Sequence, residues 1–589
     1  MGKNIVRATP PTKDPDQVYP KVPGIDFKDF ELSSEGLPQA QINKALAELL
    51  NYETLQKANF LGYQANQKLD FDSDLHQYLN YHINNIGDPF QSGNFTVNSK
   101  FVERAVLDYF ASLWNARWPH ENDPQLPYEE WKDSYWGYVL SMGSSEGNVY
   151  GLWNARDYLA GKFLLEDPEV EHVAREASKN GRTASVQRRL IYYQANADED
   201  NLNEYSPVAF YSQDTHYSII KFMSVLNFPT FYEIAVDKKF PSPLKFPDDY
   251  PPQFSSQYID QRTGWPFEVP SNEDGSVYIP ALVKLVDFFA YRGYPALVSF
   301  NYGTTFKGAF DNVKSAVDNL VPIFQKYNLY KRKVYYDPKD KTKFDIRNGF
   351  WFHVDGALGA AYMPYMEMAL NEGRLDAPKD YEFPVFDFRI EEIHSIVMSG
   401  HKWIGAPWPC GVFMTKVKFQ LQPPDNPEYI GSLDTTFAGS RNGFSALILW
   451  DYLAKHSYDS LVQKALNLEV LASYAENQLR ILSQQIGIDL WVDRSPLSLT
   501  IRFREANPTI VYTYSLSGEV LYVNGERRQY SHIFIMEHVT KDLINKLIKD
   551  LSQSGAFPPQ EVENEIPENL IVPNAKKLLH VPHTGRGFK

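Results

Sequence analysis

Lys402 lies in the stretch SGHKWIGAPWPCGVFM, residues 399–414, where mostly apolar residues follow a Ser-Gly-His turn. Burying an ammonium group without a partner is costly, and buried lysines often have a lowered pKa for that reason. Such a lysine can attack a carbonyl group and form a Schiff base. The stretch alone is equally compatible with a corner lysine whose stem packs while its ammonium group reaches water.

Two further clusters lie at the start of expected helices. Gly143, Ser144 and Ser145 follow the apolar run WGYVLSM, and free N–H groups at a helix start can bind a phosphate. A serine N-cap with an acidic residue behind it explains the same residues equally well. His216, in SQDTHYSIIK, could stack on an aromatic ring, although a lone histidine at a helix start is more often structural.

Asp355 ends the apolar run WFHVD, which reads as a buried strand. A carboxylate in this place is expected to have a cationic partner, since an unpaired buried charge is costly. The small residues Gly356 and Ala357 follow it and leave room for a flat ligand close to the backbone.

Together the four clusters predict a site for pyridoxal phosphate. Lys402 would form the imine, and Asp355 would keep the pyridine nitrogen protonated. His216 would stack on the ring, and the turn at 143–145 would bind the phosphate. Each signal is weak alone, but a chance assembly of all four is much rarer than any one of them.

Alternating strand and helix patterns must position these residues. They begin near residue 100 and predict an α/β fold with a mostly parallel sheet, which binds ligands at the carboxyl ends of its strands. We expect an N-terminal arm with helices over 1–95, a large cofactor-binding domain over 96–425, a mobile loop and small α+β domain over 426–555, and a tail over 556–589. The stretch 231–278 is rich in Pro, Asp and Ser and reads as a surface insertion.

Composition restricts the function classes. The net charge of −15 and pI near 5.4 oppose binding to nucleic acid or to an anionic membrane. The single cysteine, Cys410, excludes an internal disulfide framework and a cysteine-based zinc site, and we expect no metal. The first residues contain no long apolar stretch, so we expect no secretory signal and a cytoplasmic protein.

At these residues the chain resembles the group II pyridoxal-phosphate-dependent amino acid decarboxylases, and within them the bacterial histidine decarboxylases and plant serine decarboxylases. The resemblance rests on HINNIGDPF, WGYVLSMGSSEGNVYG, SQDTHYSIIK, NYGTTFKGAFDNV, HVDGALGA, SGHKWIGAPWPCGV and GSRNGFSALILWDYL. It implies the type I aminotransferase-like fold and a homodimer with active sites at the subunit interface.

The resemblance also implies roles for individual residues. Lys402 would be the lysine that binds pyridoxal phosphate covalently, His216 the stacking histidine and Asp355 the partner of the pyridine nitrogen. The cofactor-binding residues would further include Ser144, Ser145, Thr304, Ala357, His401 and, across the subunit interface, Ser440.

The resemblance leaves the substrate open. The chain is longer than the short histidine decarboxylases, and longer bacterial relatives look similar to enzymes of branched aliphatic amino acids such as valine or leucine. The sequence shows no clamp for an acidic side chain, so we expect a neutral L-amino acid, histidine or an aliphatic one. Two alternatives are a lyase acting on a sulfur-containing amino acid and a protein of this fold without catalysis. The first would use Cys410, which reads as a packing residue, and the second would more naturally have lost Lys402 or Asp355.

Tyr429 is the candidate donor of the proton that replaces CO₂. Its tract, Pro423 to Gly439, contains a proline-rich turn and little that predicts an anchor in the core, which is typical of a gating loop. A tyrosine that only packs against the partner subunit explains the residue equally well.

Overall fold

The computed structural model describes residues 22–32, 34–69, 74–118, 128–166, 190–375, 381–420 and 427–558 of the 589-residue chain. The arm expected up to residue 21, the tail from residue 559 and positions 421–426 of the expected loop lie outside the described residues.

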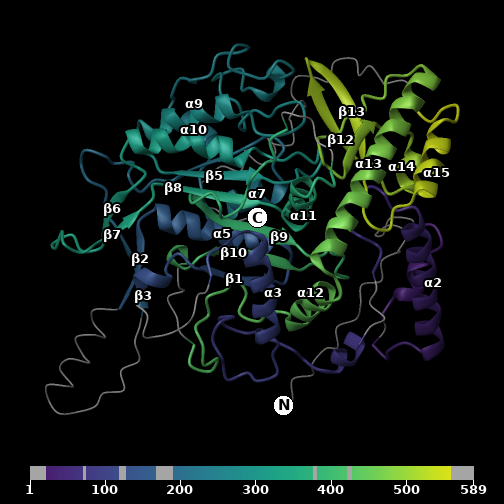
Figure 1. The fold of residues 1–589 in the computed structure, drawn as a ribbon, viewed down its shortest axis with the longest axis horizontal. Helices are drawn as coiled ribbons and strands as arrows, with labels where there is room; N and C mark the ends of the chain where they lie inside the picture. The colour runs from purple at the N-terminus through teal and green to yellow at the C-terminus, as the bar shows by residue number, and fades with distance from the viewer. Residues whose placement is uncertain are drawn as a thin grey trace, which may run out of the picture.

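A six-stranded sheet in the order β1-β10-β9-β8-β5-β4 forms the centre of the molecule (Figure 1). Four strands pair in parallel, whereas β10 is antiparallel to both neighbours, so β1 runs in the direction of β9. The mostly parallel α/β sheet expected from the sequence is therefore confirmed. The strands are β1 (Tyr135–Leu140), β4 (Val208–Tyr211), β5 (Ala296–Asn301), β8 (Phe350–Asp355), β9 (Ile393–Ser399) and β10 (Gly411–Lys416).

Helices cover both faces of this sheet, which explains why its strands are continuous apolar runs. Phe350, Phe352 and Val354 of β8 face one helical layer, and Trp351 faces the other. The first layer contains α3 (Lys100–Leu113), α9 (Ile279–Ala290), α10 (Val313–Lys326) and α11 (Gly359–Asn371); the second contains α5 (Ser144–Leu159) and α7 (Tyr217–Leu226).

A smaller α+β unit follows the large domain, as the sequence predicted. Two helices, α12 (Gly443–Lys455) and α13 (Tyr458–Ile486), lead to an antiparallel sheet in the order β11-β13-β12. Its elements are β11 (Thr500–Arg504), α14 (Pro508–Thr513), β12 (Ser517–Val523), β13 (Glu526–Phe534) and α15 (Lys541–Leu551).

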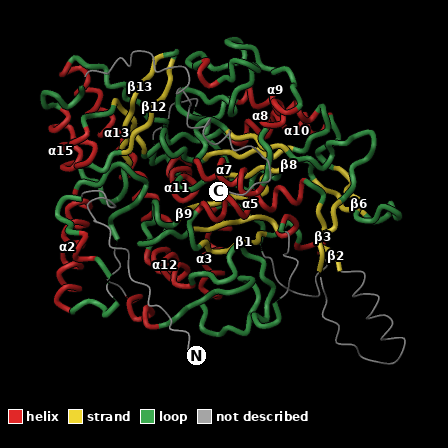
Figure 2. Tube along the Cα trace, turned by 180° about the vertical axis from the view of Figure 1, so that it is seen from behind, coloured by secondary structure: helices red, strands yellow, loops and turns green. Residues whose placement is uncertain are grey.

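The N-terminal helix α2 (Gln39–Ala58) lies at the edge of the molecule beside α15 in both views (Figures 1 and 2). The chain after it joins the small unit, because Leu61 N donates to Tyr514 O over 3.1 Å and Phe534 N donates to Leu61 O over 2.7 Å. Only Ala45 of α2 is buried, whereas Leu46, Leu50 and Leu55 are exposed. This helix therefore presents an apolar surface without covering the core.

Short elements complete the described fold. They are η1 (Phe27–Phe30), η2 (Asp74–Asn80), α4 (Tyr128–Trp131), the hairpin of β2 (Lys162–Glu166) and β3 (Leu190–Gln194), α8 (Phe231–Asp237), η3 (Ser256–Tyr258), the hairpin of β6 (Arg332–Tyr335) and β7 (Phe344–Arg347), and η4 (Val417–Phe419).

The interpretation of 231–278 as a surface insertion is wrong. Phe231, Trp265 and Val269 are buried in the main core, and Trp265 Nε1 donates to Phe240 O over 2.8 Å. The proline and aspartate residues form turns, but the aromatic residues between them bury a large apolar area in the core. The segment is thus part of the large domain.

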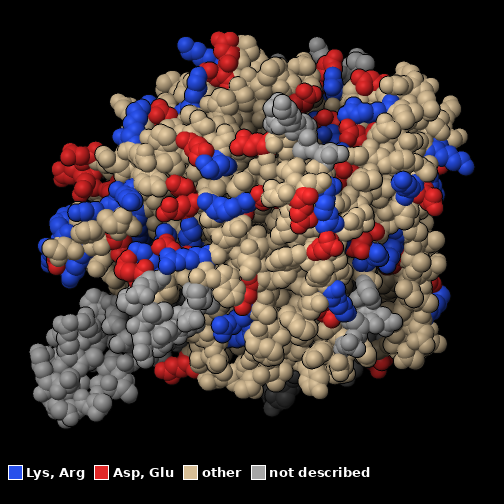
Figure 3. Space-filling view, in the orientation of Figure 1, with Lys and Arg blue, Asp and Glu red and all other residues tan. Residues whose placement is uncertain are grey.

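Acidic and basic side chains are interspersed on the face shown in Figure 3, so the net negative charge is not gathered in one patch there. Within the described ranges, no helix combines the length and apolar character needed to span a membrane.

Candidate active site

The residues predicted to carry chemistry follow the carboxyl ends of five strands. The turn at Gly143 follows β1, His216 follows β4 and Thr304 follows β5. Asp355 is the last residue of β8, and Lys402 comes three residues after the end of β9. These strand ends share one edge of the sheet, where α/β proteins bind ligands.

The turn before α5 is built around Gly143. Its φ of 70° lies in the left-handed region, and a Cβ atom there would come within 2.6 Å of His401 Cε1. Ser399 Oγ accepts from Ser144 N over 3.0 Å and donates to Ser144 Oγ over 2.8 Å, which ties the turn to the end of β9. The pKa of His401 is lowered to about 4, mainly by burial and to a smaller extent by the nearby charge of Lys402. The turn therefore brings neutral donors to the start of α5.

Lys402 is half-buried at the same edge, and its Nζ donates to Gln64 Oε1 over 2.6 Å. Burial lowers the pKa of Lys402 to about 8, while the charge of Asp355 acts in the opposite direction. A substantial fraction of the amine is therefore unprotonated at slightly alkaline pH, as a nucleophile toward a carbonyl requires. Gln64 Nε2 is buried and has no hydrogen-bond partner among the described residues, so a donor is left for a ligand.

Asp355 is buried and is held by two neutral donors. Asn148 Nδ2 donates to its Oδ2 over 2.8 Å, and Ala357 N donates to its Oδ1 over 3.2 Å. The sequence led us to expect a cationic partner for this carboxylate. Among the described residues the hydrogen bond comes from an amide of α5, and the charge of Lys402 acts without a hydrogen bond to Asp355.

His216 caps α7, where its Nδ1 accepts from Ser218 N over 3.3 Å. Burial lowers its pKa, with smaller opposing effects from Asp355, which raises it, and Lys402, which lowers it. The position of His216 after β4 places the imidazole at the same strand ends as both groups, in agreement with these charge effects. Its capping bond and its place in the site are compatible, because the described hydrogen bonds of the ring use Nδ1 and leave Nε2 for a ligand.

Thr304 and Ala357 complete the edge through backbone contacts. Thr304 is buried, and its Oγ1 accepts from Ala309 N over 2.9 Å, which closes the turn after β5. Ala357 O accepts from Ser399 N over 3.0 Å. The structure thus brings Ser144, Thr304, Asp355, Ala357, His401 and Lys402 to one region, with Ser145 next along α5.

The tract that follows residue 427 is anchored more firmly than the sequence suggested. Ile430 and Thr435 are buried, and Asp88 N donates to Leu433 O over 2.8 Å. Arg441, just after the tract, forms a buried ion pair with Glu103, and removing one partner of such a pair costs about 3–5 kcal/mol. The expectation that little anchors the tract from Pro423 to Gly439 is wrong for 430–436, since the partners of this stretch lie far away in sequence.

Tyr429 and Ser440 lie outside this buried stretch. Tyr429 is 78% exposed, and its carbonyl accepts from Asn94 Nδ2 over 3.3 Å. Ser440 is also exposed, and its Oγ accepts from Asn84 Nδ2 over 3.1 Å. Within one chain, their described contacts are with residues 84 and 94 and not with Lys402.

Cys410 is fully buried, and burial raises the pKa of its thiol to about 12. A thiol with this pKa supplies little thiolate, the reactive form. Cys410 therefore packs in the core, as its surroundings in the sequence suggested.

Sequence reasoning missed Gln64 and gave no role to Asn148. Gln64 is 338 positions from Lys402, in a stretch with no chemical motif, so no local signal identifies it. Asn148 lies one turn inside α5 in the quoted motif GSSEGN, and its polarity on a buried helix face was the available signal.

Comparisons with known proteins point to one class. The conserved domain of the pyridoxal-dependent decarboxylases matches residues 267–484, which include Thr304, Asp355 and Lys402. A crystal structure of L-methionine decarboxylase from Streptomyces sp. 590, in complex with L-methionine methyl ester, is 41% identical. The match covers 90% of this chain and 98% of that one, with a TM-score of 0.77.

Two curated relatives are more distant. Serine decarboxylase 3 from Oryza sativa subsp. japonica is 28% identical over 86% of this chain and 80% of its own length. Histidine decarboxylase from Mesorhizobium japonicum is 27% identical over 87% of this chain and 98% of its own.

Proposed function

Because the chain belongs to the pyridoxal-dependent decarboxylase family, we propose that it converts L-methionine, or a neutral amino acid of similar unbranched shape, to the amine and CO₂. The observation that carries the proposal is the neutral amide of Gln64 beside Lys402, whose Nε2 has no hydrogen-bond partner among the described residues. A neutral donor does not select a charged substrate side chain. The 41% identity to a methionine decarboxylase, against 24–28% for the serine and histidine decarboxylases, favours a thioether over an imidazole or hydroxyl.

The residues present fit pyridoxal phosphate, the cofactor of this family. Lys402 is the amine that would bind it covalently, and Asp355 the carboxylate that would accept the ring N–H. Ser144 and Ser145 at the start of α5, with the neutral His401, would hold the phosphate. When bound, the cofactor takes up the electron pair released as the carboxylate leaves as CO₂.

This chain's own residues then position the substrate and move protons. His216, with a lowered pKa and its Nδ1 used in the cap of α7, would pack on the ring as a neutral imidazole. Orientation decides whether CO₂ or a proton leaves Cα, so the residues that line the site would have to fix the direction of the substrate carboxylate. Gln64 is placed to contact the substrate from the N-terminal segment.

We assign the proton that replaces CO₂ to Tyr429 of a second subunit. The exposure of Tyr429, directly before the buried Ile430, supports this role, because it presents the phenol outward from an anchored position. Ser440 would contact the phosphate across the same interface. A packing role for Tyr429 at that interface remains the alternative, and Tyr429→Phe separates the two.

In Tyr429→Phe the ring is kept and only the acid is lost. A donor role predicts that amine formation falls about a hundredfold while the cofactor still reacts with substrate. Quantifying amine and aldehyde products in single-turnover experiments checks this. Unchanged amine formation would remove the donor role and leave the packing role.

The homodimer itself is supported by large apolar side chains that are exposed in a single chain. Phe101 is 76% exposed, Met142 53% and Trp450 46%, and α2 adds its leucines. Light scattering of the purified protein should give twice the chain mass of 67.8 kDa, and Phe101→Glu should shift it toward one chain. A monomer with full activity would refute shared sites.

The substrate is tested by comparing kcat/KM for methionine, leucine, valine, histidine and serine, with the amine measured by mass spectrometry. We expect methionine to exceed leucine and valine about tenfold or more, since an apolar pocket separates such side chains by about 1–3 kcal/mol. A preference for histidine or serine would overturn the proposal. Gln64→Leu should raise the KM for methionine and leave the cofactor stoichiometry at one per chain.

A further inference from the structure

Asp355 is the last member of a series of buried hydrogen bonds between the central sheet and α5. Trp351, His353 and Asp355 alternate along β8 and therefore face the same side, toward α5. Ser395 of β9 lies opposite His353 in the strand register, and Asn148 of α5 lies above both strands. Asn148, His353 and Ser395 are all fully buried.

The chemistry of the groups determines which one donates and which one accepts in each hydrogen bond of this series. Trp351 Nε1, which only donates, bonds to Ser395 Oγ over 3.1 Å, and Ser395 Oγ lies 2.8 Å from His353 Nδ1. Asn148 Nδ2 donates to Asp355 Oδ2 over 2.8 Å, so the amide turns its Oδ1, which only accepts, toward His353. His353 Nε2 therefore carries the imidazole proton and donates to Asn148 Oδ1 over 2.9 Å, and Nδ1 accepts from the Ser395 hydroxyl.

Two glycines on α5 make this approach possible. A Cβ atom at Gly147 would come within 2.4 Å of Val397 Cγ2, and one at Gly151 within 3.1 Å of the His353 ring. The helix thus lies close enough to the sheet for Asn148 to bridge His353 and Asp355. The spacing of the two glycines places both on the sheet-facing side, one helical turn apart.

We propose that Asn148 and His353 are positioning residues that hold Asp355 as an oriented acceptor for the ring nitrogen of the cofactor. The bonds run in one direction, Trp351 to Ser395 to His353 to Asn148 to Asp355, and each donor polarises the next. The inference rests on the cofactor assignment above, but it does not depend on which amino acid is the substrate.

The electrostatics of the hydrogen-bonded residues agree with this role. Burial lowers the pKa of His353 to about 4, so the imidazole is neutral at physiological pH, although Asp355 acts in the opposite direction. A neutral relay orients the carboxylate without cancelling its charge. A contacting lysine or arginine would instead compete with the ring N–H for the same oxygens.

The test uses the holoprotein reconstituted with pyridoxal phosphate labelled with ¹⁵N in the ring. Asn148→Leu and His353→Leu remove successive links, and the ¹⁵N resonance should move toward that of an unprotonated ring nitrogen. We expect kcat to fall about 10- to 100-fold with KM changed less than threefold. His353→Gln keeps a donor near the position of Nε2, so it should recover most of the resonance position and of kcat.

His394→Leu is the matched control, because His394 is equally buried on the neighbouring strand, where its Nδ1 accepts from Phe352 N over 3.1 Å and it stacks on Trp351. Its substitution should leave the ¹⁵N resonance unchanged. Ser395→Ala removes only the far hydroxyl and serves if the leucine variants do not fold, with a smaller shift in the same direction.

An unchanged ¹⁵N resonance in folded, cofactor-loaded Asn148→Leu, His353→Leu or Ser395→Ala would overturn the proposal and reduce these residues to a structural role. Wild-type protein that binds the cofactor but prefers another amino acid would refute only the proposed substrate. Failure of the wild type to bind the cofactor would refute the assignment on which both rest.

Discussion

Two lysines at opposite ends of the strands of the central sheet have the same lowered pKa and different surroundings. Burial lowers the pKa of both Lys402 and Lys416 to about 8. Lys402 follows the end of β9, whereas Lys416 ends the antiparallel β10 and thus lies where β1 begins. A lowered pKa therefore cannot by itself distinguish a nucleophile from a packed cation.

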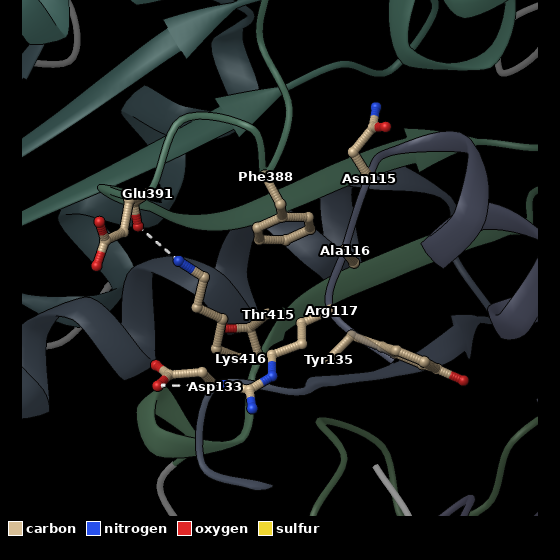
Figure 4. Close-up of a pocket in the computed structure, with 9 residues that line it drawn as sticks. All are labelled: Asn115, Ala116, Arg117, Asp133, Tyr135, Phe388, Glu391, Thr415 and Lys416. Atoms are coloured by element: carbon tan, nitrogen blue, oxygen red, sulfur yellow. Dashed lines mark hydrogen bonds and ion pairs between the residues drawn. The ribbon is translucent and has the colours of Figure 1, made fainter. Parts of the chain in front are cut away.

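The partners make the difference. Lys416 Nζ donates to the backbone carbonyl of Glu391 over 2.5 Å and lines a cavity of about 280 Å³ with Asp133 and Arg117 (Figure 4). Lys402 has a side-chain acceptor, Gln64, and the charge of Asp355 nearby. Loops from parallel strand ends converge only at the Lys402 edge, and this convergence supplies the acid, the amide donors and the phosphate turn.

Substituting the two lysines should give the largest contrast. Lys402→Ala removes the amine that binds the cofactor, and we expect turnover to fall about 10⁴-fold or more. Lys416→Met keeps the length and apolar stem, so turnover should stay near wild type. Steady-state amine production and the visible absorption of the bound cofactor measure both. Near-normal activity of Lys402→Ala, or loss of cofactor binding in Lys416→Met, would break the comparison.

Asp355→Asn should have the next largest effect. It keeps the shape of the side chain and loses the charge, and we expect a loss of several powers of ten in turnover with the fold retained. A loss below about tenfold, which corresponds to 1.4 kcal/mol, would mean that another group holds the ring.

The same variant sharpens the comparison in the apoprotein. Because Asp355 raises the pKa of Lys402, that pKa should fall further below about 8, whereas the pKa of Lys416 should not change. ¹³C NMR of methylated lysines, assigned with the Lys402 and Lys416 variants, follows both groups. Equal shifts at the two lysines would show a global change of structure.

Gly143→Ala should have an intermediate effect on the cofactor site. The alanine meets both a positive φ and the His401 ring, and the strained backbone alone costs about 1–2 kcal/mol. Gly264→Ala is the matched control, since Gly264 has φ +72° and no heavy atom within 4 Å of an added Cβ. We expect at least a tenfold greater loss of cofactor affinity in Gly143→Ala, measured by titrating the apoprotein. Equal losses would mean that the approach of His401 to the turn is unimportant.

The sequence could predict the sheet and the residues at its carboxyl edge because both are local signals. Asp355 and Lys402 follow apolar runs directly, and strand ends are where α/β proteins place ligands. Gln64, Asn148 and His353 could not be assigned in the same way. Gln64 contacts Lys402, 338 positions away, and Asn148 contacts Asp355 and His353, 207 and 205 positions away. His353 also contacts Ser395, 42 positions away.

The same limit explains the two errors in the fold. Composition made 231–278 look like a surface insertion, yet Trp265 fills a core position that only the tertiary structure defines. In the tract after 427, the anchors are Asp88 and Asn94, and Glu103 holds the nearby Arg441; all three lie far earlier in the chain. Local propensity predicts where a turn lies, but not what it packs against.

The smallest expected effect is the pH dependence of stability carried by Lys416. Its pKa is about 8 in the folded state, against about 10.5 in the unfolded chain, so between these values the unfolded state binds more protons. The free energy of unfolding should therefore rise with pH in this window, by at most about 1.4 kcal/mol per pH unit. Below pH 8 Lys416 is charged in the folded state, and burial of this charge lowers the free energy of unfolding by its full amount.

Lys416→Met removes this titration and also the bond to Glu391 O, a loss that does not depend on pH. The difference in thermal midpoint, variant minus wild type, should then decrease steadily from pH 8 to pH 10. Both proteins must be compared at equal concentrations of chain and cofactor, because bound ligand shifts the midpoint. In the holoprotein Lys402 is occupied by the cofactor on our proposal, so the slope belongs to Lys416. A difference that is flat across this window would show that Lys416 keeps its proton in the fold, and the two lysines would then differ in charge as well as in partners.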